Sequence, residues 1–291
     1  MHIGCQGWNY EDWVTKLGGP QVIYPHGTRP HDMLALYARA YESVEVDSTF
    51  YAVPATSAVE NWEKRTPAEF TFSLKLPREI THERAFGAGS EGLLAEFCER
   101  ARTLKEKLGC VLIQTAPQFE ASPDAVRALK TFLPLLPRDV RFSVEFRHHS
   151  WASSDTAELL SKFNVPVTLV EGRWINRRAL WQLFARQQVD FAYVRWMGER
   201  DLTRFDAVQR PQEQNLETWA RACERLRERV PKVYAYFSNF YEGYAPASAN
   251  KLKKLLGEQV VEAEELEDQL GLFGRMKDVW KDEGGGMKDE S

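Results

Sequence analysis

Short apolar runs alternate with longer amphipathic stretches along most of the chain. The runs are only a few residues long and rich in valine, phenylalanine and tyrosine, which is typical of strands buried in a sheet. The pattern predicts eight strands: Ile3–Gly7, Ser43–Asp47, Phe70–Lys75, Cys110–Thr115, Arg141–Phe146, Val165–Val170, Phe191–Arg195 and Lys232–Ser238.

The stretches between these runs carry apolar residues three and four positions apart, which predicts helices with one buried face. The clearest examples are Leu93–Leu108 and Leu216–Val230. Two helix starts are also recognisable. Ser57 with Glu60 predicts a capping box, and Pro123 after Ser122 suits the first position of a helix.

Eight strands joined by helical crossovers predict parallel pairing, and eight parallel strands close into a (β/α)8 TIM barrel. The alternative is an open doubly wound sheet, but no glycine-rich nucleotide-binding motif follows the first strand. We expect one barrel domain over residues 1–256. Residues 257–291 form an extension. Its composition predicts an acidic helix over Glu258–Leu272 and a disordered tail at the glycine-rich end.

Composition and charge narrow the class of protein. The net charge of −4 gives no overall attraction to nucleic acid. No apolar run is long enough to span a membrane, and the N-terminal residues show no signal-peptide pattern. The four cysteines are far apart and include no CxxC pair, which favours reduced core thiols and a cytoplasmic protein.

Side chains of a strand alternate between the two faces of a sheet, so the polar residues among the predicted strands should point into the barrel. Active sites of such barrels lie at the carboxyl ends of the strands. The residues expected there are acidic (Glu45, Asp47 and Glu145), basic (Lys75, Arg147 and Arg195) and neutral (Gln114 and Asn239).

Buried charges must be paired, with each other or with a polar ligand. One interpretation is therefore an ion-pair network that only stabilises the barrel. We favour a binding pocket, because the charges gather at the end of the barrel where ligands bind. In this reading Glu45, Asp47 and Glu145 are the catalytic candidates. The candidates for substrate binding are Trp8, Tyr51, Lys75, Gln114, Arg147, Arg195 and Asn239.

No cofactor is firmly implied, although a divalent metal would find suitable ligand types in Glu45, Asp47, Glu145 and His148. The spacing of these residues matches no specific metal motif. Aromatic residues offer stacking walls for a sugar or base, and Trp151 and Trp196 are further candidates besides Trp8 and Tyr51, each equally suited to core packing.

The segments that supply these residues resemble the YecE-like family, whose members are largely uncharacterised. The resemblance spans residues 1–256. It rests on Ile3-Gly4-Cys5-Gln6-Gly7-Trp8, Val44-Glu45-Val46-Asp47-Ser48-Thr49-Phe50-Tyr51, Phe72-Ser73-Leu74-Lys75 with Ile80-Thr81-His82, Val144-Glu145-Phe146-Arg147-His148, Tyr193-Val194-Arg195 and Tyr236-Phe237-Ser238-Asn239. It implies a (β/α)8 barrel and no established activity. Several neutral positions differ from the usual family pattern, among them Gln6.

Three functions remain open at this point. The first, which we favour, is an enzyme or binding protein for a small anionic ligand such as a phosphorylated sugar or nucleotide fragment. The second is a metal-dependent endonuclease-like or nucleic-acid-binding barrel, with Arg173, Arg177, Arg178 and Arg186 as the basic segment. The third is a non-catalytic scaffold that docks a protein partner, as yet unknown, through the acidic extension.

Overall fold

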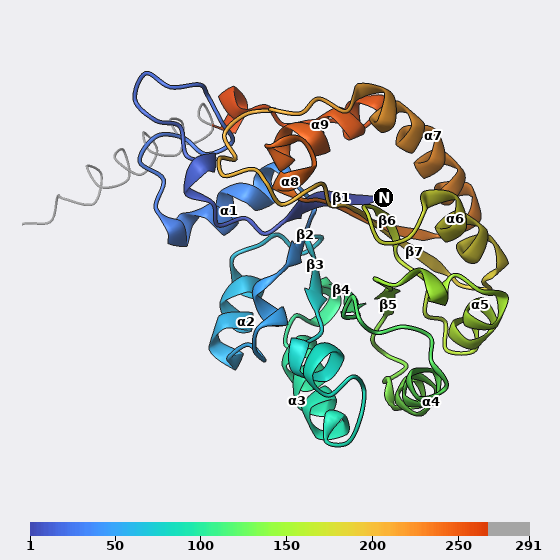
Figure 1. Ribbon diagram of the computed structural model, residues 1–291. Helices are drawn as coiled ribbons and strands as arrows, with labels where there is room; N and C mark the ends of the chain where they lie inside the picture. The colour runs from blue at the N-terminus through green and yellow to red at the C-terminus, as the bar shows by residue number, and fades with distance from the viewer. Residues whose placement is uncertain (267–291) are drawn as a thin grey trace, which may run out of the picture.

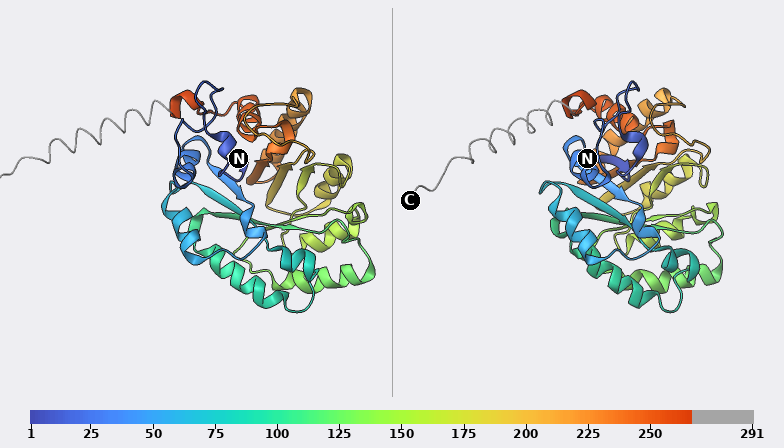
Figure 2. Two further views of the ribbon diagram at one scale, coloured as in Figure 1. Left: turned by 60° about the vertical axis from the view of Figure 1, so that its left-hand side comes forward. Right: turned by 90° about the vertical axis from the view of Figure 1, so that its left-hand side faces the viewer.

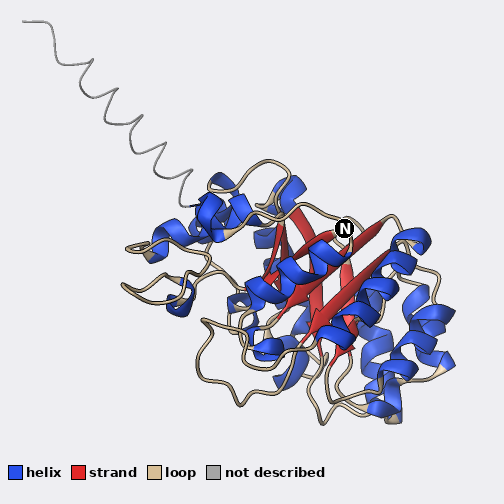
Figure 3. Cartoon of the chain, turned by 90° about the horizontal axis from the view of Figure 1, so that it is seen from above, coloured by secondary structure: helices blue, strands red, loops and turns tan. Residues whose placement is uncertain are grey.

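The computed structural model describes residues 1–266, which form a ring of parallel strands enclosed by helices (Figure 1). The strands follow the order β5-β4-β3-β2-β1-β8-β7-β6, each hydrogen-bonded to the next, and a single bridge between Val144 and Val167 joins the two ends of this sheet into a ring. Seen from above, the strands lie at the centre with helices on the outside (Figure 3). The predicted (β/α)8 barrel is therefore confirmed.

All eight predicted strands are present, with ends that differ by a few residues. Their bounds are β1 His2–Gln6, β2 Ser43–Val46, β3 Thr71–Lys75, β4 Leu108–Gln114, β5 Phe142–Glu145, β6 Leu169–Glu171, β7 Phe191–Trp196 and β8 Lys232–Phe237. The turned views in Figure 2 show the strands running through the middle of the molecule.

Helices follow the strands and cover the outside of the barrel. They are α1 Pro30–Ala40, α2 Thr56–Lys64, α3 Ser90–Arg102, α4 Pro123–Phe132, α5 Ser154–Ser161, α6 Arg177–Arg186, α7 Glu213–Arg229, α8 Asn239–Glu242 and α9 Ala245–Leu255. Short 3-10 turns and one π turn, η3 Glu79–Glu83, lie in the loops.

The sixth strand is shorter than the predicted Val165–Val170. Its first half meets β5 only through a bridge at Val167, where the Val144 amide donates to the Pro166 carbonyl at 3.0 Å and Val144 accepts from the Thr168 amide at 2.8 Å. Pro166 has no N–H to donate, so a regular ladder cannot form at this position. The contact between β5 and β6 is therefore the thinnest seam of the barrel.

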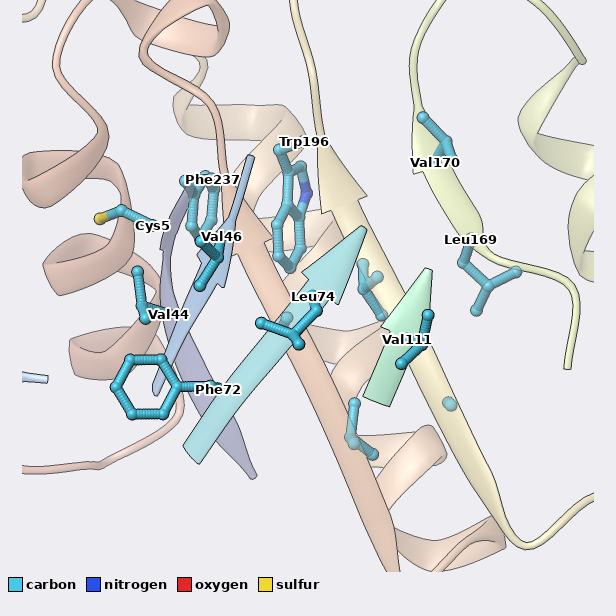
Figure 4. Close-up of a cluster of buried hydrophobic side chains, with 14 of the residues drawn as sticks. Cys5, Val44, Val46, Phe72, Leu74, Val111, Leu169, Val170, Trp196 and Phe237 are labelled. Carbon is cyan, nitrogen blue, oxygen red and sulfur yellow. The ribbon is translucent and has the colours of Figure 1, made fainter. Parts of the chain in front are cut away.

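The predicted alternation of side chains along the strands is correct. Apolar residues such as Val44, Phe72 and Leu74 point outward and pack beneath the helices (Figure 4). A separate hydrophobic cluster from β4, β7 and β8 fills part of the interior of the barrel: Cys110, Leu112, Phe191, Tyr193, Tyr234 and Tyr236. The hydroxyl of Tyr236 bonds Ser43 Oγ at 2.6 Å and Ser73 Oγ at 2.9 Å, so this buried hydroxyl is paired.

Two helix boundaries differ from prediction. The expected helix Leu93–Leu108 ends at Arg102, because the chain turns at Lys105, whose φ of 54° is left-handed, and Leu108 already belongs to β4. The predicted capping box is wrong. The N-cap residue of α2 is Ala55, which is extended and lies two residues before Ser57, and the helix has no side-chain cap. By contrast, Ser122 caps α4, accepting from the Ala125 amide at 3.2 Å.

The acidic extension is not helical from Glu258 onward as predicted. Residues 258–262 are irregular, residues 263–266 are helical, and the rest of the predicted helix and tail lies outside the described residues. Glu258 pairs with Arg227, Glu262 pairs with Lys254 at 2.5 Å, and Leu266 is fully buried. The described part of the extension thus packs on its own barrel.

The four cysteines are buried and carry free thiols, as their spacing predicted. Within residues 1–266, no helix has both the length and the apolar character required to cross a membrane.

Candidate functional site

The guanidinium of Arg195 lies inside the barrel near the carboxyl ends of the strands. Arg195 comes from the end of β7 and is fully buried. It lies between two carboxylates from opposite sides of the ring. Its Nη2 donates to Glu45 Oε1 at 2.7 Å, and its Nη1 donates to Glu145 Oε2. Such a charge-assisted pairing satisfies both acids and the cation in the absence of water.

Two neutral amides complete the surroundings of Arg195. Nη1 also donates to Gln114 Oε1 at 3.2 Å. The Gln6 carboxamide oxygen accepts from Nε at 3.2 Å and from Nη2 at 3.1 Å, because the opposite orientation would set amide N–H groups against guanidinium N–H groups. An arginine has five N–H donors, and the protein supplies an acceptor for each of them.

The two buried glutamates have different second partners. Glu145 Oε1 accepts from Arg147 Nε at 2.8 Å, and Arg147 Nη2 donates to Gln114 Oε1 at 2.7 Å. Glu45 Oε2 accepts instead from the neutral hydroxyl of Tyr193 at 2.7 Å. Glu145 is therefore hydrogen-bonded to two cations and Glu45 to one, with Lys75 acting on Glu45 from a greater distance.

This asymmetry shifts the two acidities in opposite directions. Burial would by itself raise the pKa of Glu145, but Arg195 and Arg147 outweigh it and lower that pKa to about 2. Burial also raises the pKa of Glu45, and here the attraction of Arg195 does not cancel it, while Asp47 adds repulsion. Burial is the largest of these effects on Glu45.

A second ion pair lies above this network. Lys75 at the end of β3 is 6% exposed, and its Nζ lies 3.1 Å from Asp47 Oδ1 and 4.4 Å from the centre of the Phe50 ring. The chain leaves β2 through a 3-10 turn, and Thr49 in that turn ties it to β3: its hydroxyl donates to the Lys75 carbonyl at 2.9 Å. Asp47 and Lys75 are therefore held side by side.

A pocket of about 290 Å³ opens above Arg195 at the carboxyl ends of the strands. Polar residues and apolar side chains share its lining: Gln6, Tyr10, Asp47, Tyr51, Lys75, Arg195, Met197, Arg200, Phe205, Ser238, Asn239 and Phe240. Gly198 allows the loop after β7 to pass close to the backbone of Phe240, because a Cβ at this position would lie 1.9 Å from the Phe240 carbonyl oxygen. This hollow lies at the end of the barrel where the sequence analysis expects the site.

Asn239 is the polar group of this pocket that lacks a full set of partners. Its Oδ1 accepts from the Trp13 indole N–H at 3.2 Å and from the Ala245 amide at 3.0 Å, and these two donors fix the orientation of the amide. Its Nδ2 is buried and has no hydrogen-bond partner of good geometry within the described protein; the Tyr10 hydroxyl, which it influences electrostatically, is too poorly placed to satisfy it. A buried donor of this kind is costly unless an outside acceptor reaches it.

Most of the predicted residues come together, in two tiers. Asp47, Tyr51, Lys75, Arg195 and Asn239 line the pocket, whereas Glu45, Glu145, Gln114 and Arg147 support Arg195 from beneath or beside it. Trp8 does not line the pocket: its ring packs edge-on against Trp62, with centroids 5.9 Å apart.

The four candidate metal ligands do not form one cluster. Glu45, Asp47 and Glu145 are bound by cationic side chains, and His148 turns away, with its Nδ1 2.8 Å from Ser150 Oγ and its ring stacked on His149. Within residues 1–266, no group of three or more metal-binding side chains is arranged to hold an ion.

Two other aromatic candidates belong to the core. Trp151 is 1% exposed and stacks on Phe146 with centroids 4.6 Å apart, and Trp196 stacks on Phe237 at 4.1 Å. For these residues the core-packing interpretation is correct.

The structure adds pocket residues that the strand pattern did not identify. Tyr10, Met197, Arg200, Phe205 and Phe240 all lie in loops or in the short α8. The available signal was their place directly after a strand end, since such loops form the mouth of a barrel.

Larger hollows of about 580 and 500 Å³ lie at the opposite end of the barrel. They are lined by residues at the starts of strands, such as Phe142, Phe191 and Thr71. We favour the smaller pocket as the candidate site because it alone of the three lies at the end of the barrel where ligands bind and opens onto the buried charges.

Two known proteins are similar to this chain in sequence. The chain is 25% identical over 276 residues to UPF0759 protein YunF of Bacillus subtilis, with 88% of this chain and 94% of that protein covered. It is 31% identical over 148 residues to UPF0759 protein YecE of Escherichia coli K12, a match that spans 51% of this chain and only 48% of the relative.

Solved structures give the same picture. A DUF72 family protein of Thermotoga maritima superposes with a TM-score of 0.71 at 26% identity, covering 88% of this chain and 99% of the other. A DUF72 family protein of Enterococcus faecalis has a TM-score of 0.69 at 19% identity over 89% of this chain and 96% of the other, and shows the shared fold. The family model described as "Protein of unknown function DUF72" matches residues 2–270. The chain therefore belongs to the DUF72 family of proteins of unknown function.

Proposed function

We propose that the pocket above Arg195 binds a small anionic ligand, such as a phosphorylated sugar or a nucleotide fragment. The observation that carries this proposal is the buried Nδ2 of Asn239, which lines the pocket and has no hydrogen-bond partner of good geometry within the described protein. Because its Oδ1 is anchored by Trp13 and Ala245, the amide cannot turn to hide the nitrogen. A ligand oxygen is the acceptor that would satisfy it.

The charges around the pocket favour an anion. The buried network of Arg195 and Arg147 with Glu45 and Glu145 has two charges of each sign. Apart from Arg195, the charged residues that line the pocket are Lys75, Arg200 and Asp47, so one positive charge is in excess; Lys75 pairs with Asp47. Lys75 has three N–H donors, which leaves it able to bind a ligand oxygen as well as Asp47.

The size and walls of the pocket favour a small ligand with an apolar or ring-shaped part. Its volume of about 290 Å³ lies at the lower end of the range for ligand pockets. Tyr10, Phe205 and Phe240 form apolar walls, and the Tyr51 ring stands at the mouth, 72% exposed. Such faces stack on sugars and bases.

Asp47 is the carboxylate that would act on a ligand. Of the three acidic residues considered as catalytic candidates, it alone lines the pocket. Glu45 and Glu145 are at most 1% exposed and lie behind Arg195, so they position the arginine. We assign any proton transfer at the bound ligand to Asp47, held in place by Lys75.

The test is calorimetric titration of the purified protein with glucose 6-phosphate and AMP, compared with glucose and adenosine. We expect the phosphorylated compounds to bind and their uncharged counterparts to bind at least tenfold more weakly, in line with the strength of charge-assisted hydrogen bonds of about 1.5–3 kcal/mol.

Two variants locate the binding. Asn239→Asp keeps the oxygen that Trp13 and Ala245 need but replaces the free N–H group by a carboxylate oxygen, so it should abolish binding of the anion. Lys75→Gln should weaken binding about tenfold or more. Lys130→Gln, an exposed lysine on α4, is the matched control and should bind as the wild type does. Equal binding of sugar and sugar phosphate would contradict the proposal.

The other two functions predict different results. Nucleic-acid binding would weaken steeply with salt, and it would depend on the arginine segment, where Arg177 is already engaged by Glu171 and Asn215. A scaffold would bind neither phosphorylated compound. The titrations, repeated with a DNA and an RNA oligonucleotide at two salt concentrations, separate the three.

A further inference from the structure

One edge of the Arg195 guanidinium is covered by the side chain of Gln6, and both residues line the pocket. This edge consists of Nε and Nη2, whose parallel N–H bonds form the fork that grips carboxylates and phosphates in two-point contacts. The Gln6 oxygen accepts from both, at 3.2 and 3.1 Å. A neutral oxygen thus occupies the place where an anionic group would bind this arginine.

Gln6 stands between the pocket and that edge. It is the last residue of β1, it lines the pocket, and it is only 4% exposed. The other donors of Arg195 point away, to Glu45, Glu145 and Gln114. Removal of the Gln6 side chain would therefore leave the fork without its acceptor beside the pocket that both residues line.

A neutral acceptor suits this position because the network around Arg195 has no net charge. Two carboxylates are already balanced by Arg195 and Arg147. Gln6 satisfies the remaining N–H bonds without adding a third negative charge, and it also keeps a second anionic group of any ligand from reaching Arg195.

We propose that Gln6 is a specificity-determining residue, which covers the anion-binding edge of Arg195 and directs the anionic group of the ligand to Lys75 and Arg200. The inference rests on the proposed function for the place where the ligand binds. It implies a preference: the wild-type pocket accommodates one anionic group, and a second one on the same ligand adds no affinity.

The experiment compares two probes that differ by one anionic group, glycerol 3-phosphate and 3-phosphoglycerate, by calorimetric titration. In the wild type we expect similar dissociation constants. In Gln6→Ala and Gln6→Ser we expect 3-phosphoglycerate to bind about tenfold tighter than glycerol 3-phosphate, because its carboxylate gains a two-point contact with Arg195.

Two controls separate the guanidinium edge from mere space. Met197→Ala enlarges the same pocket and removes the sulfur that lies 3.0 Å from the Gln6 amide, but it leaves Gln6 on the guanidinium edge and should leave the ratio of the two constants unchanged. Gln6→Glu places a carboxylate on the fork and should also give no gain. Circular dichroism and a urea unfolding curve confirm that each variant is folded. If one of Gln6→Ala and Gln6→Ser does not fold, the other still tests the proposal.

The outcomes are distinct. An unchanged ratio in both Gln6→Ala and Gln6→Ser, or an equal gain in Met197→Ala, would overturn the assignment of Gln6 while leaving the proposed function intact. A wild type that binds neither probe, together with a Gln6→Ala variant that binds 3-phosphoglycerate, would overturn the proposed function and support the role of Gln6.

Discussion

Arg195 shows how much a single side chain depends on its surroundings. It is fully buried, and it neutralises two carboxylates that have no access to water. Removing one member of a buried ion-pair network leaves charges without a partner, which is more damaging than losing the pair as a whole.

We therefore expect Arg195→Leu to lower the free energy of unfolding by about 3–5 kcal/mol. Urea unfolding followed by fluorescence at neutral pH measures the change. Arg200→Leu is the matched control, because Arg200 is exposed at the pocket mouth, and its effect should stay within about 0.5 kcal/mol. Equal effects of the two substitutions would show that Arg195 does not hold the barrel together.

The two glutamates should give opposite pH dependences. The folded-state pKa of Glu145 is lowered to about 2 from an ordinary value of 4.5, so its contribution to stability is present at neutral pH and is lost as the pH falls between these values. The pKa of Glu45 is raised, so its contribution becomes less favourable as the pH rises above its ordinary range.

The measurement is the difference in unfolding free energy between pH 6 and pH 3 in urea. Glu145→Gln should make this difference smaller than in the wild type, and Glu45→Gln should make it larger. Each variant serves as the control for the other. Shifts in the same direction would show that the two carboxylates do not differ in the way their partners indicate.

At the scale of the element, helix starts offer a direct comparison between two serines. Ser122 accepts a hydrogen bond from the Ala125 amide and caps α4, whereas Ser57 lies inside the first turn of α2 and caps nothing. A side-chain cap satisfies a backbone N–H that the helix itself leaves unpaired.

Ser122→Ala should accordingly cost about 1 kcal/mol of stability, and Ser57→Ala should be close to neutral. The midpoints of urea unfolding curves for the two variants test this. A larger loss for Ser57→Ala than for Ser122→Ala would mean that the capping box predicted from the sequence forms after all.

At the scale of the whole molecule, the extension after α9 completes the surface of the barrel. Leu266 is buried in the main hydrophobic cluster, and Val261 packs against the same cluster. The extension is therefore part of the folded unit as far as Leu266, and the pairs of Glu258 and Glu262 with Arg227 and Lys254 fasten it.

Leu266→Ala should lower the unfolding free energy by about 2–5 kcal/mol, as expected for a buried leucine. Leu255→Ala, at the end of α9, is the control, because Leu255 is 42% exposed and should cost less than about 1 kcal/mol. A neutral result for Leu266→Ala would indicate that the extension does not depend on this contact.

The family, the barrel and most of the polar interior were predictable from the sequence. The alternation of apolar and polar residues in Ser43–Asp47 and Phe70–Lys75 is a local property of each strand, and it places Glu45 and Lys75 inside the barrel whatever the exact bounds. The boundaries of α2 and α3 were less predictable, because turns such as that at Lys105 follow from where the next strand must begin.

The sequence by itself determined which side chains point into the barrel. Side chains alternate between the two faces of a strand, and eight parallel strands form a closed barrel, so one of the two faces is the interior. Only the tertiary structure decided how those side chains pair. Arg195 joins Glu45 and Glu145 across separations of 150 and 50 residues, and the orientation of Asn239 depends on Trp13, 226 residues away. Such contacts are set by the closure of the ring and the paths of its loops, which no local pattern encodes.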